Sequence, residues 1–150
     1  MSDPQAVGAF FDIDGTLVPS GSLELRFVLY LLSRGKLGVR NLLGWLLRGI
    51  RLAPQGWARA IQANKFYLAD VPVSLAADWA NAMALERLNR NTLPISPSGF
   101  DRIAWHQSRS HRVFLVSGTL APLAIAVASS LPGQVEVVAT ELTERMRPAD

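Results

Sequence analysis

A short apolar run that ends abruptly in acids is the feature that most restricts how this chain can fold. Residues 6–11 are all apolar or glycine, and Asp12-Ile13-Asp14-Gly15-Thr16 follows at once. An apolar run of this length, bounded by turn residues, is typical of a buried strand in a parallel sheet. Open α/β sheets bind their ligands at the carboxyl ends of such strands. The pattern therefore predicts an α/β fold with polar chemistry directly after its first strand.

The second half of the sequence supports the same fold class. A helix is predicted over 97–109, with Ser96 as its N-cap and Pro97 in its first turn. The elements predicted after it are a strand over 113–116, a helix over about 120–131 and a strand over 135–138. This order implies parallel strands joined by a right-handed crossover. We expect the first strand to join the same sheet.

A long helical stretch separates the first strand from the others. From residue 22 to about 90, apolar residues recur at helical spacing, and glycines and prolines divide the stretch into roughly four helices. We therefore predict two parts. An α/β core comprises residues 1–20 and 92–150, and an all-helical cap at 21–91 is inserted in it.

Two carboxylates spaced two residues apart, Asp12 and Asp14, are the strongest candidates for a reactive site. One can attack a phosphorus atom and form an aspartyl-phosphate, while the other protonates the leaving oxygen and later activates water. Gly15 allows a tight turn and Thr16 offers a hydroxyl. Because two acids repel a phosphate, this chemistry requires a cation, and an all-oxygen site suits Mg²⁺. An ordinary turn after a strand is the alternative interpretation.

A second candidate segment, Ser117-Gly118-Thr119, follows the strand predicted over 113–116 and precedes the next helix. A hydroxyl and free backbone N–H groups at a helix N-terminus form an anion site. The alternative is an ordinary N-cap. In a parallel sheet this segment is expected beside Asp12, which favours a phosphate site.

These segments resemble two motifs of the haloacid dehalogenase-like phosphohydrolases. Asp12-Ile13-Asp14-Gly15-Thr16 resembles the first motif, Phe114-Leu115-Val116-Ser117-Gly118-Thr119 resembles the second, and the helical insertion resembles the cap of subfamily IB, which includes phosphoserine phosphatase-like enzymes. The resemblance implies a Rossmann-like parallel sheet. It also implies Asp12 as nucleophile and Mg²⁺ ligand, and Asp14 as general acid/base whose backbone carbonyl also contacts the metal. Phosphate would be bound by Gly15, Thr16, Ser117 and Gly118.

The later motifs of that family are not found in the sequence. The 33 residues after Ser117 contain no lysine and no adjacent pair of acids, which the third and fourth motifs would supply. We therefore expect an incomplete member of the family, with a core that is incomplete at its C-terminus.

Charge is distributed unevenly along the chain. Residues 20–65 carry eight basic residues against one acid, Glu24, whereas the remainder carries seven basic residues and eleven acids. Glu24 is either a contact at the entrance of the cap or a first-turn helix charge. Lys65 and Arg59 are candidate contacts to a substrate phosphate. Nucleic acid is not an expected partner, because the basic residues alternate with leucines rather than with base-stacking aromatics.

One segment of this basic region predicts an amphipathic helix. Arg40, Arg48 and Arg51 fall on one side of a helical projection and oppose Val39, Leu42, Leu46 and Ile50. Such a helix can lie on an anionic membrane surface, which would make the protein a peripheral membrane partner. A cap helix with a solvated basic face is the alternative.

Together these features predict a Mg²⁺-dependent phosphomonoester hydrolase that acts on a small phosphorylated metabolite. The first alternative is a lipid-phosphate phosphatase similar to phosphatidylglycerophosphatases, and the second is a non-catalytic phosphate-binding or interaction module. The sequence contains no cysteine, so a disulfide framework is excluded. Residues 1–5 lack the pattern of a signal peptide, and no apolar run approaches the roughly 18 residues of a membrane span. We expect a cytoplasmic protein.

Overall fold

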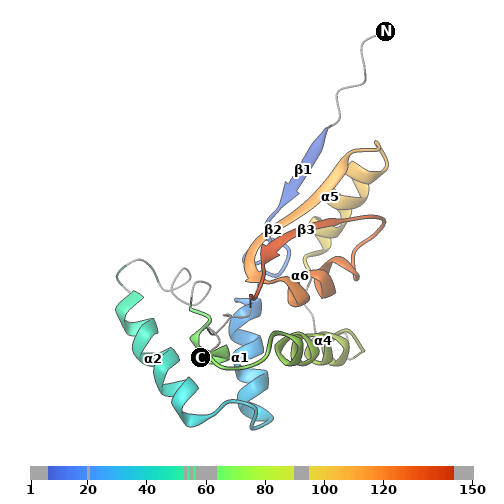
Figure 1. The fold of residues 1–150 in the computed structure, drawn as a ribbon. Helices are drawn as coiled ribbons and strands as arrows, with labels where there is room; N and C mark the ends of the chain where they lie inside the picture. Colours follow the sequence, from blue (N-terminus) through green and yellow to red (C-terminus); the bar gives the residue numbers. More distant parts are fainter. Residues whose placement is uncertain are drawn as a thin grey trace.

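Three parallel strands form the sheet of the computed structural model, which describes residues 7–19, 21–52, 54, 56, 64–89 and 95–143. The strands are β1 (Gly8–Phe11), β2 (Arg112–Leu120) and β3 (Glu136–Thr140), and β2 lies between the other two (Figure 1). All pairings are parallel, so the first strand joins the sheet as predicted. The α/β class with a Rossmann-like parallel sheet is confirmed.

Two helices cover one face of this sheet. Helices α5 (Pro97–Gln107) and α6 (Ala121–Ala128) both contact β2, and α6 connects β2 to β3. The Ser96 side chain accepts a hydrogen bond from Gly99 N at 3.3 Å and Pro97 opens α5, which confirms the predicted start of this helix. Alternate strand residues are buried, among them Val113 and Leu115, while Phe10 on the opposite face is exposed.

The end of β2 differs from the expectation. We predicted a strand that stops at residue 116 and a helix that begins near residue 120, with Ser117-Gly118-Thr119 at its N-terminus. Instead β2 continues to Leu120 with a shift of register relative to β3, and α6 begins at Ala121. Pro122 lies in the first turn of α6, and proline lacks the N–H that a position deeper in a helix would need. The helix therefore begins too late for this segment to form its N-terminus.

Most of the described residues between β1 and α5 are helical. This part of the chain contains α1 (Leu23–Ser33), α2 (Val39–Leu52), the 3₁₀ helix η2 (Phe66–Leu68) and α4 (Val73–Asn89). Helix α1 contacts α4 and β2, and α4 contacts α6. Phe27 and Leu31 of α1 therefore share one buried core with the strand residues. The division into a core of 1–20 and 92–150 and a cap of 21–91 stays a prediction. No helix in the described part of the chain is long and apolar enough to cross a membrane.

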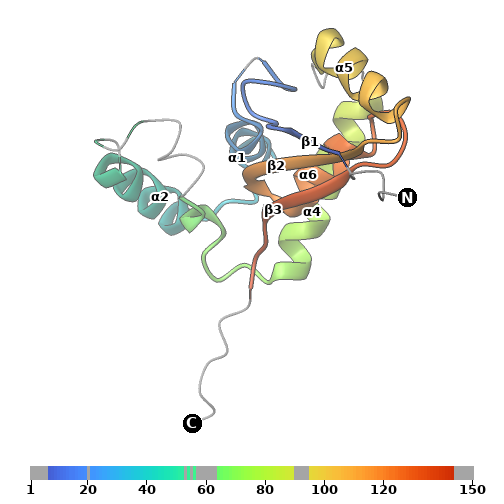
Figure 2. The same ribbon diagram turned by 90° about the horizontal axis from the view of Figure 1, so that it is seen from above.

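Helix α2 lies at the periphery, away from the sheet in both views (Figures 1 and 2). It contacts η2, and its backbone approaches closely at Gly44, where an added methyl group would overlap the ring of Phe66. A methyl group at Gly49 would instead meet only Asn64 Nδ2, at an ordinary 3.7 Å. Helix α2 is therefore tightly packed against its neighbours at Gly44 and loosely packed at Gly49.

This difference predicts opposite effects for two otherwise identical substitutions. Gly49→Ala should raise the free energy of unfolding by up to about 1 kcal/mol, because alanine is the better helix former. Gly44→Ala should lower it, because the new methyl group must displace the Phe66 ring. Denaturant unfolding followed by circular dichroism measures both changes. Equal stabilisation by the two variants would contradict the packing of α2 on η2 through Gly44.

Candidate active site

The register of the sheet brings the two motif segments together. Phe11 at the end of β1 pairs with Leu115 of β2, so Asp12 and Val116 are the next residues along two adjacent parallel strands. The chain therefore leaves the sheet at Asp12, at the same edge of the sheet where Ser117 lies. The chain then turns back on itself, with Gly15 N donating to Val18 O at 3.0 Å and Gly15 at a φ of 87°. Glycine adopts this left-handed conformation without strain.

The Asp12 side chain is exposed at this edge. Partial desolvation raises the pKa of its carboxyl group, a backbone hydrogen bond from Ile13 lowers it, and the charge of Asp14 raises it further. The balance is a raised pKa, so the protonated form persists to higher pH than in a free aspartate. The proximity of the two acids, Asp12 and Asp14, is the electrostatic feature of this edge that favours a bound cation.

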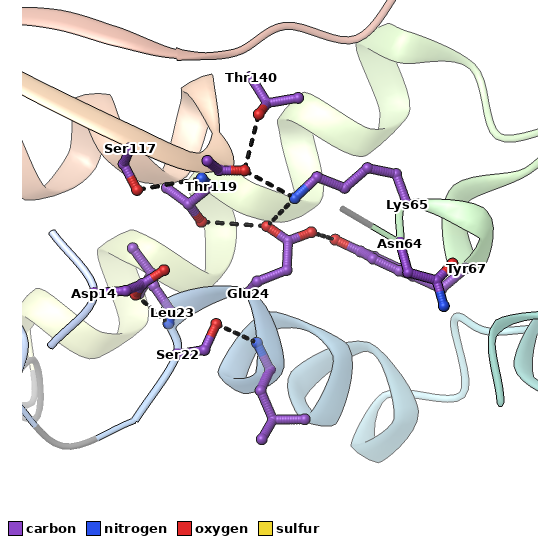
Figure 3. Close-up of polar contacts among 12 residues, drawn as sticks. Asp14, Ser22, Leu23, Glu24, Asn64, Lys65, Tyr67, Ser117, Thr119 and Thr140 are labelled. Atoms are coloured by element: carbon purple, nitrogen blue, oxygen red, sulfur yellow. Dashed lines mark hydrogen bonds and ion pairs between the residues drawn. The ribbon is translucent and has the colours of Figure 1, made fainter. Parts of the chain in front are cut away.

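Asp14 is held by the first turn of α1. Its Oδ1 atom accepts a hydrogen bond from Leu23 N at 2.7 Å (Figure 3). The N-terminus of a helix carries unsatisfied N–H groups and a partial positive charge, so it stabilises a carboxylate at this place. The helical part of the chain therefore contributes to the position of the second acid of the pair.

The second motif segment is already engaged in hydrogen bonds within the protein. Thr119 N donates to Ser117 Oγ at 3.2 Å. The carbonyl oxygen of Gly118 accepts from Lys65 Nζ at 3.2 Å and from Thr140 Oγ1 at 2.8 Å. The expectation of free N–H groups at this segment is therefore wrong for Thr119. The irregular backbone at the end of β2 turns the Gly118 carbonyl toward side chains from two other elements.

A fully buried carboxylate, that of Glu24 in α1, lies at the centre of a polar network beside this segment (Figure 3). Its oxygens accept hydrogen bonds from the Tyr67 hydroxyl and, at 3.2 Å, from Thr119 Oγ1. Lys65 Nζ forms an ion pair with Glu24 Oε2 at 2.8 Å. Burial raises the pKa of the Tyr67 hydroxyl, and the neighbouring charge of Glu24 raises it further. The network joins α1, η2 and the end of β2.

The sequence interpretation found only part of this arrangement. Lys65 was a candidate phosphate contact, and the structure shows it bound to Glu24 and to the Gly118 carbonyl. The sequence does not point to Tyr67 or Thr140, and it marks Thr119 only as part of the second motif, because the partners of these side chains are distant in sequence. Gly15 and Thr16 are exposed in the turn after β1. Arg59 lies outside the described residues.

The oxygen ligands that follow β1 suit a metal ion that prefers oxygen and keeps some of its bound water. In the part of the chain that the structure describes, no cluster of three or more histidine, cysteine or acidic side chains could hold a metal ion. Mg²⁺ is usually bound by one or two carboxylates together with waters and substrate phosphates. Asp12 and Asp14 provide such a set, so the residues present fit Mg²⁺ better than a metal that needs a closed protein cage.

The ion pair predicts unequal roles for the two lysines of the chain. Lys65→Met should lower the free energy of unfolding by about 3 kcal/mol or more, because it leaves the buried Glu24 carboxylate without its cation. Lys36 is exposed and its ammonium lies 5.9 Å from the Trp79 ring, so Lys36→Met should cost no more than about 1 kcal/mol. Denaturant titration of the two variants measures both changes. An equal loss of unfolding free energy in the two would argue against the ion pair.

The family model for haloacid dehalogenase-like hydrolases matches residues 9–148. Comparison with curated proteins found no match. Among solved structures, the crystal structure of a protein with unknown function from Bordetella pertussis Tohama I is similar, with a TM-score of 0.66 and 22% identity. The match covers 94% of this chain and 63% of that one, so this chain spans less than two thirds of its length. Similarity to a structure at 22% identity is evidence for the fold alone. The match to the family model, in contrast, covers most of the sequence. The chain therefore belongs to the haloacid dehalogenase-like hydrolase family.

Proposed function

We propose that this chain carries the site of a Mg²⁺-dependent phosphomonoester hydrolase that acts on a small phosphorylated metabolite. Its family membership supports a hydrolase of the phosphatase type in general terms. The observation that carries the finer proposal is the pair of acids after β1, Asp12 and Asp14, at the same sheet edge as Ser117. We place the chain with the phosphoserine phosphatase-like subfamily IB, because the helical insertion resembles the cap of that group.

In the first half of the reaction, Asp12 acts as the nucleophile. A carboxylate oxygen of Asp12 forms a bond to phosphorus while the bond between phosphorus and the leaving oxygen breaks. The protonated Asp14 gives its proton to that oxygen, so the product leaves as a neutral alcohol. The hydrogen bond from Leu23 N to Asp14 Oδ1 holds the acid beside the nucleophile.

In the second half, the aspartyl-phosphate is hydrolysed. Asp14, now a carboxylate, takes a proton from a water molecule whose oxygen attacks the phosphorus. The bond between phosphorus and Asp12 breaks, which releases inorganic phosphate and restores both side chains.

Asp12 and Asp14 would hold the Mg²⁺ ion. When bound, the ion neutralises charge on the phosphoryl oxygens and on the two acids that otherwise repel the substrate. Gly15, Thr16, Ser117 and Gly118 would contact the phosphate oxygens. Lys65 lies next to Gly118 as a further candidate phosphate contact, and the buried Glu24 carboxylate keeps its ammonium group in place.

Loss of the nucleophile gives the direct test of this proposal. With Mg²⁺ and p-nitrophenyl phosphate, Asp12→Asn should reduce phosphate release by at least about a thousandfold, since an amide cannot form the phosphoryl intermediate. Asp78→Asn, a change at an exposed acid of α4, is the matched control and should retain the activity. Removal of Mg²⁺ with a chelator should abolish it as well.

Two outcomes would contradict the assignment. Phosphate release that persists in Asp12→Asn would exclude Asp12 as the nucleophile. Phosphate binding by the unmodified protein without any turnover would favour the non-catalytic phosphate-binding module instead.

The role of Asp14 predicts a dependence on the leaving group. Asp14→Asn should slow hydrolysis of alkyl phosphates by about a hundredfold or more, because an alkoxide leaves poorly without a proton. Hydrolysis of p-nitrophenyl phosphate should fall much less, since its phenolate leaves without protonation. Rates for a series of esters with increasing leaving-group pKa provide the measurement, and an equal loss across the series would exclude the general-acid role.

A lipid-phosphate phosphatase is the second candidate, and one observation favours it. The apolar side of α2 is exposed and bordered by arginines, as expected of an enzyme that works at a membrane surface. Faster hydrolysis of phosphatidylglycerophosphate in vesicles than of water-soluble esters would select this candidate over the first.

A further inference from the structure

The side of helix α2 that faces the protein combines polar contacts with the half-buried ring of Trp45, which packs against the core. Asn41 Nδ2 donates hydrogen bonds to the carbonyl oxygens of Tyr67 and Ala69 at 3.2 and 2.9 Å. The carbonyl of Trp45 accepts a hydrogen bond from Asn64 Nδ2 at 2.7 Å. Together with the close approach of Gly44 to Phe66, these contacts fix the rotation of the helix about its axis.

The opposite side of the helix is apolar and exposed. Its five large apolar side chains are between 47% and 75% exposed: Val39, Leu43, Leu46, Leu47 and Ile50. None of the residues of α2 is fully buried. A surface helix of a globular protein normally turns its apolar stripe toward the core. In α2 these five side chains instead lie on the exposed side, so the apolar stripe is available to a partner.

Charge decides which kind of partner fits this stripe. Helix α2 contains no acidic residue, and it carries Arg40, Arg48 and Arg51. At about 100° per residue, Arg40 and Arg51 fall at one border of the apolar stripe. The Arg40 side chain is 78% exposed even though it pairs with Asp70. The acid of α1, Glu24, is buried in its own network and offers no negative charge to this surface.

We infer that α2 binds the surface of a bilayer that contains anionic lipids. Its apolar stripe enters the boundary between headgroups and acyl chains, and the bordering arginines contact lipid phosphates. Long arginine side chains reach the headgroups while their stems lie on apolar surface. With 14 residues, α2 is shorter than the roughly 20 residues of a membrane-spanning helix, so it lies in the surface and does not cross the bilayer.

This inference does not depend on the proposed hydrolase activity, so its test measures lipid binding alone. The unmodified protein is sedimented with phosphatidylcholine vesicles that contain about one quarter phosphatidylglycerol, and with vesicles of phosphatidylcholine alone. We expect binding to the anionic vesicles that weakens as salt is added, because the arginine contacts are screened. A failure of the hydrolase proposal would leave this result unchanged.

A triple variant, L43Q/L47Q/I50Q, tests whether the apolar stripe makes the contact. It should reduce binding to anionic vesicles by at least about tenfold, since it removes most of the apolar surface that enters the boundary. These side chains are exposed, so the fold should be retained, which circular dichroism verifies. L85Q is the matched control, because Leu85 of α4 is 61% exposed and lies outside the stripe.

Three results would overturn the inference. The first is no binding of the unmodified protein to anionic vesicles at low salt. The second is undiminished binding by the triple variant. The third is a dimer in light scattering that the triple variant abolishes, since a second copy of the chain would then cover the stripe.

Discussion

The buried carboxylate of Glu24 is the constraint on which the arrangement of the site depends. A charge removed from water must find a partner of opposite sign and further hydrogen bonds, or the fold is strongly destabilised. Glu24 meets this requirement with Lys65, Tyr67 and Thr119. These partners come from the segment around η2 and from the end of β2. One desolvated group thereby fixes the helical part of the chain against the sheet edge that carries the motif residues.

A second connection reinforces the first. Asp14 accepts a hydrogen bond from Leu23 N, one residue before Glu24 in α1. The first turn of α1 is therefore bound both to the turn after β1 and to the irregular end of β2. The position of the acid pair relative to Ser117 thus depends on packing of the helical insertion, in addition to the pairing of β1 with β2.

The same principle, that buried groups must be satisfied, also bears on the orientation of α2. Its inner side meets the backbone carbonyls around η2, and Asn41 satisfies two of them. A leucine at that place would leave those carbonyls without donors. Trp45 is the side chain of α2 that packs against the core, while the five side chains of the apolar stripe lie on the opposite, exposed side. The inner polar contacts and the outer apolar stripe are two consequences of one orientation.

The sequence by itself determined the α/β class, the parallel order of the strands, the start of α5 at Ser96 and the place of Asp12 and Asp14 after β1. These features follow from local patterns: apolar runs, helical periodicity and capping residues. Only the tertiary structure decided the burial of Glu24, the extension of β2 through Ser117 and the outward direction of the stripe on α2. Glu24 and Thr119 are 95 residues apart, and helical periodicity shows that a helix has two faces without showing which one meets the protein.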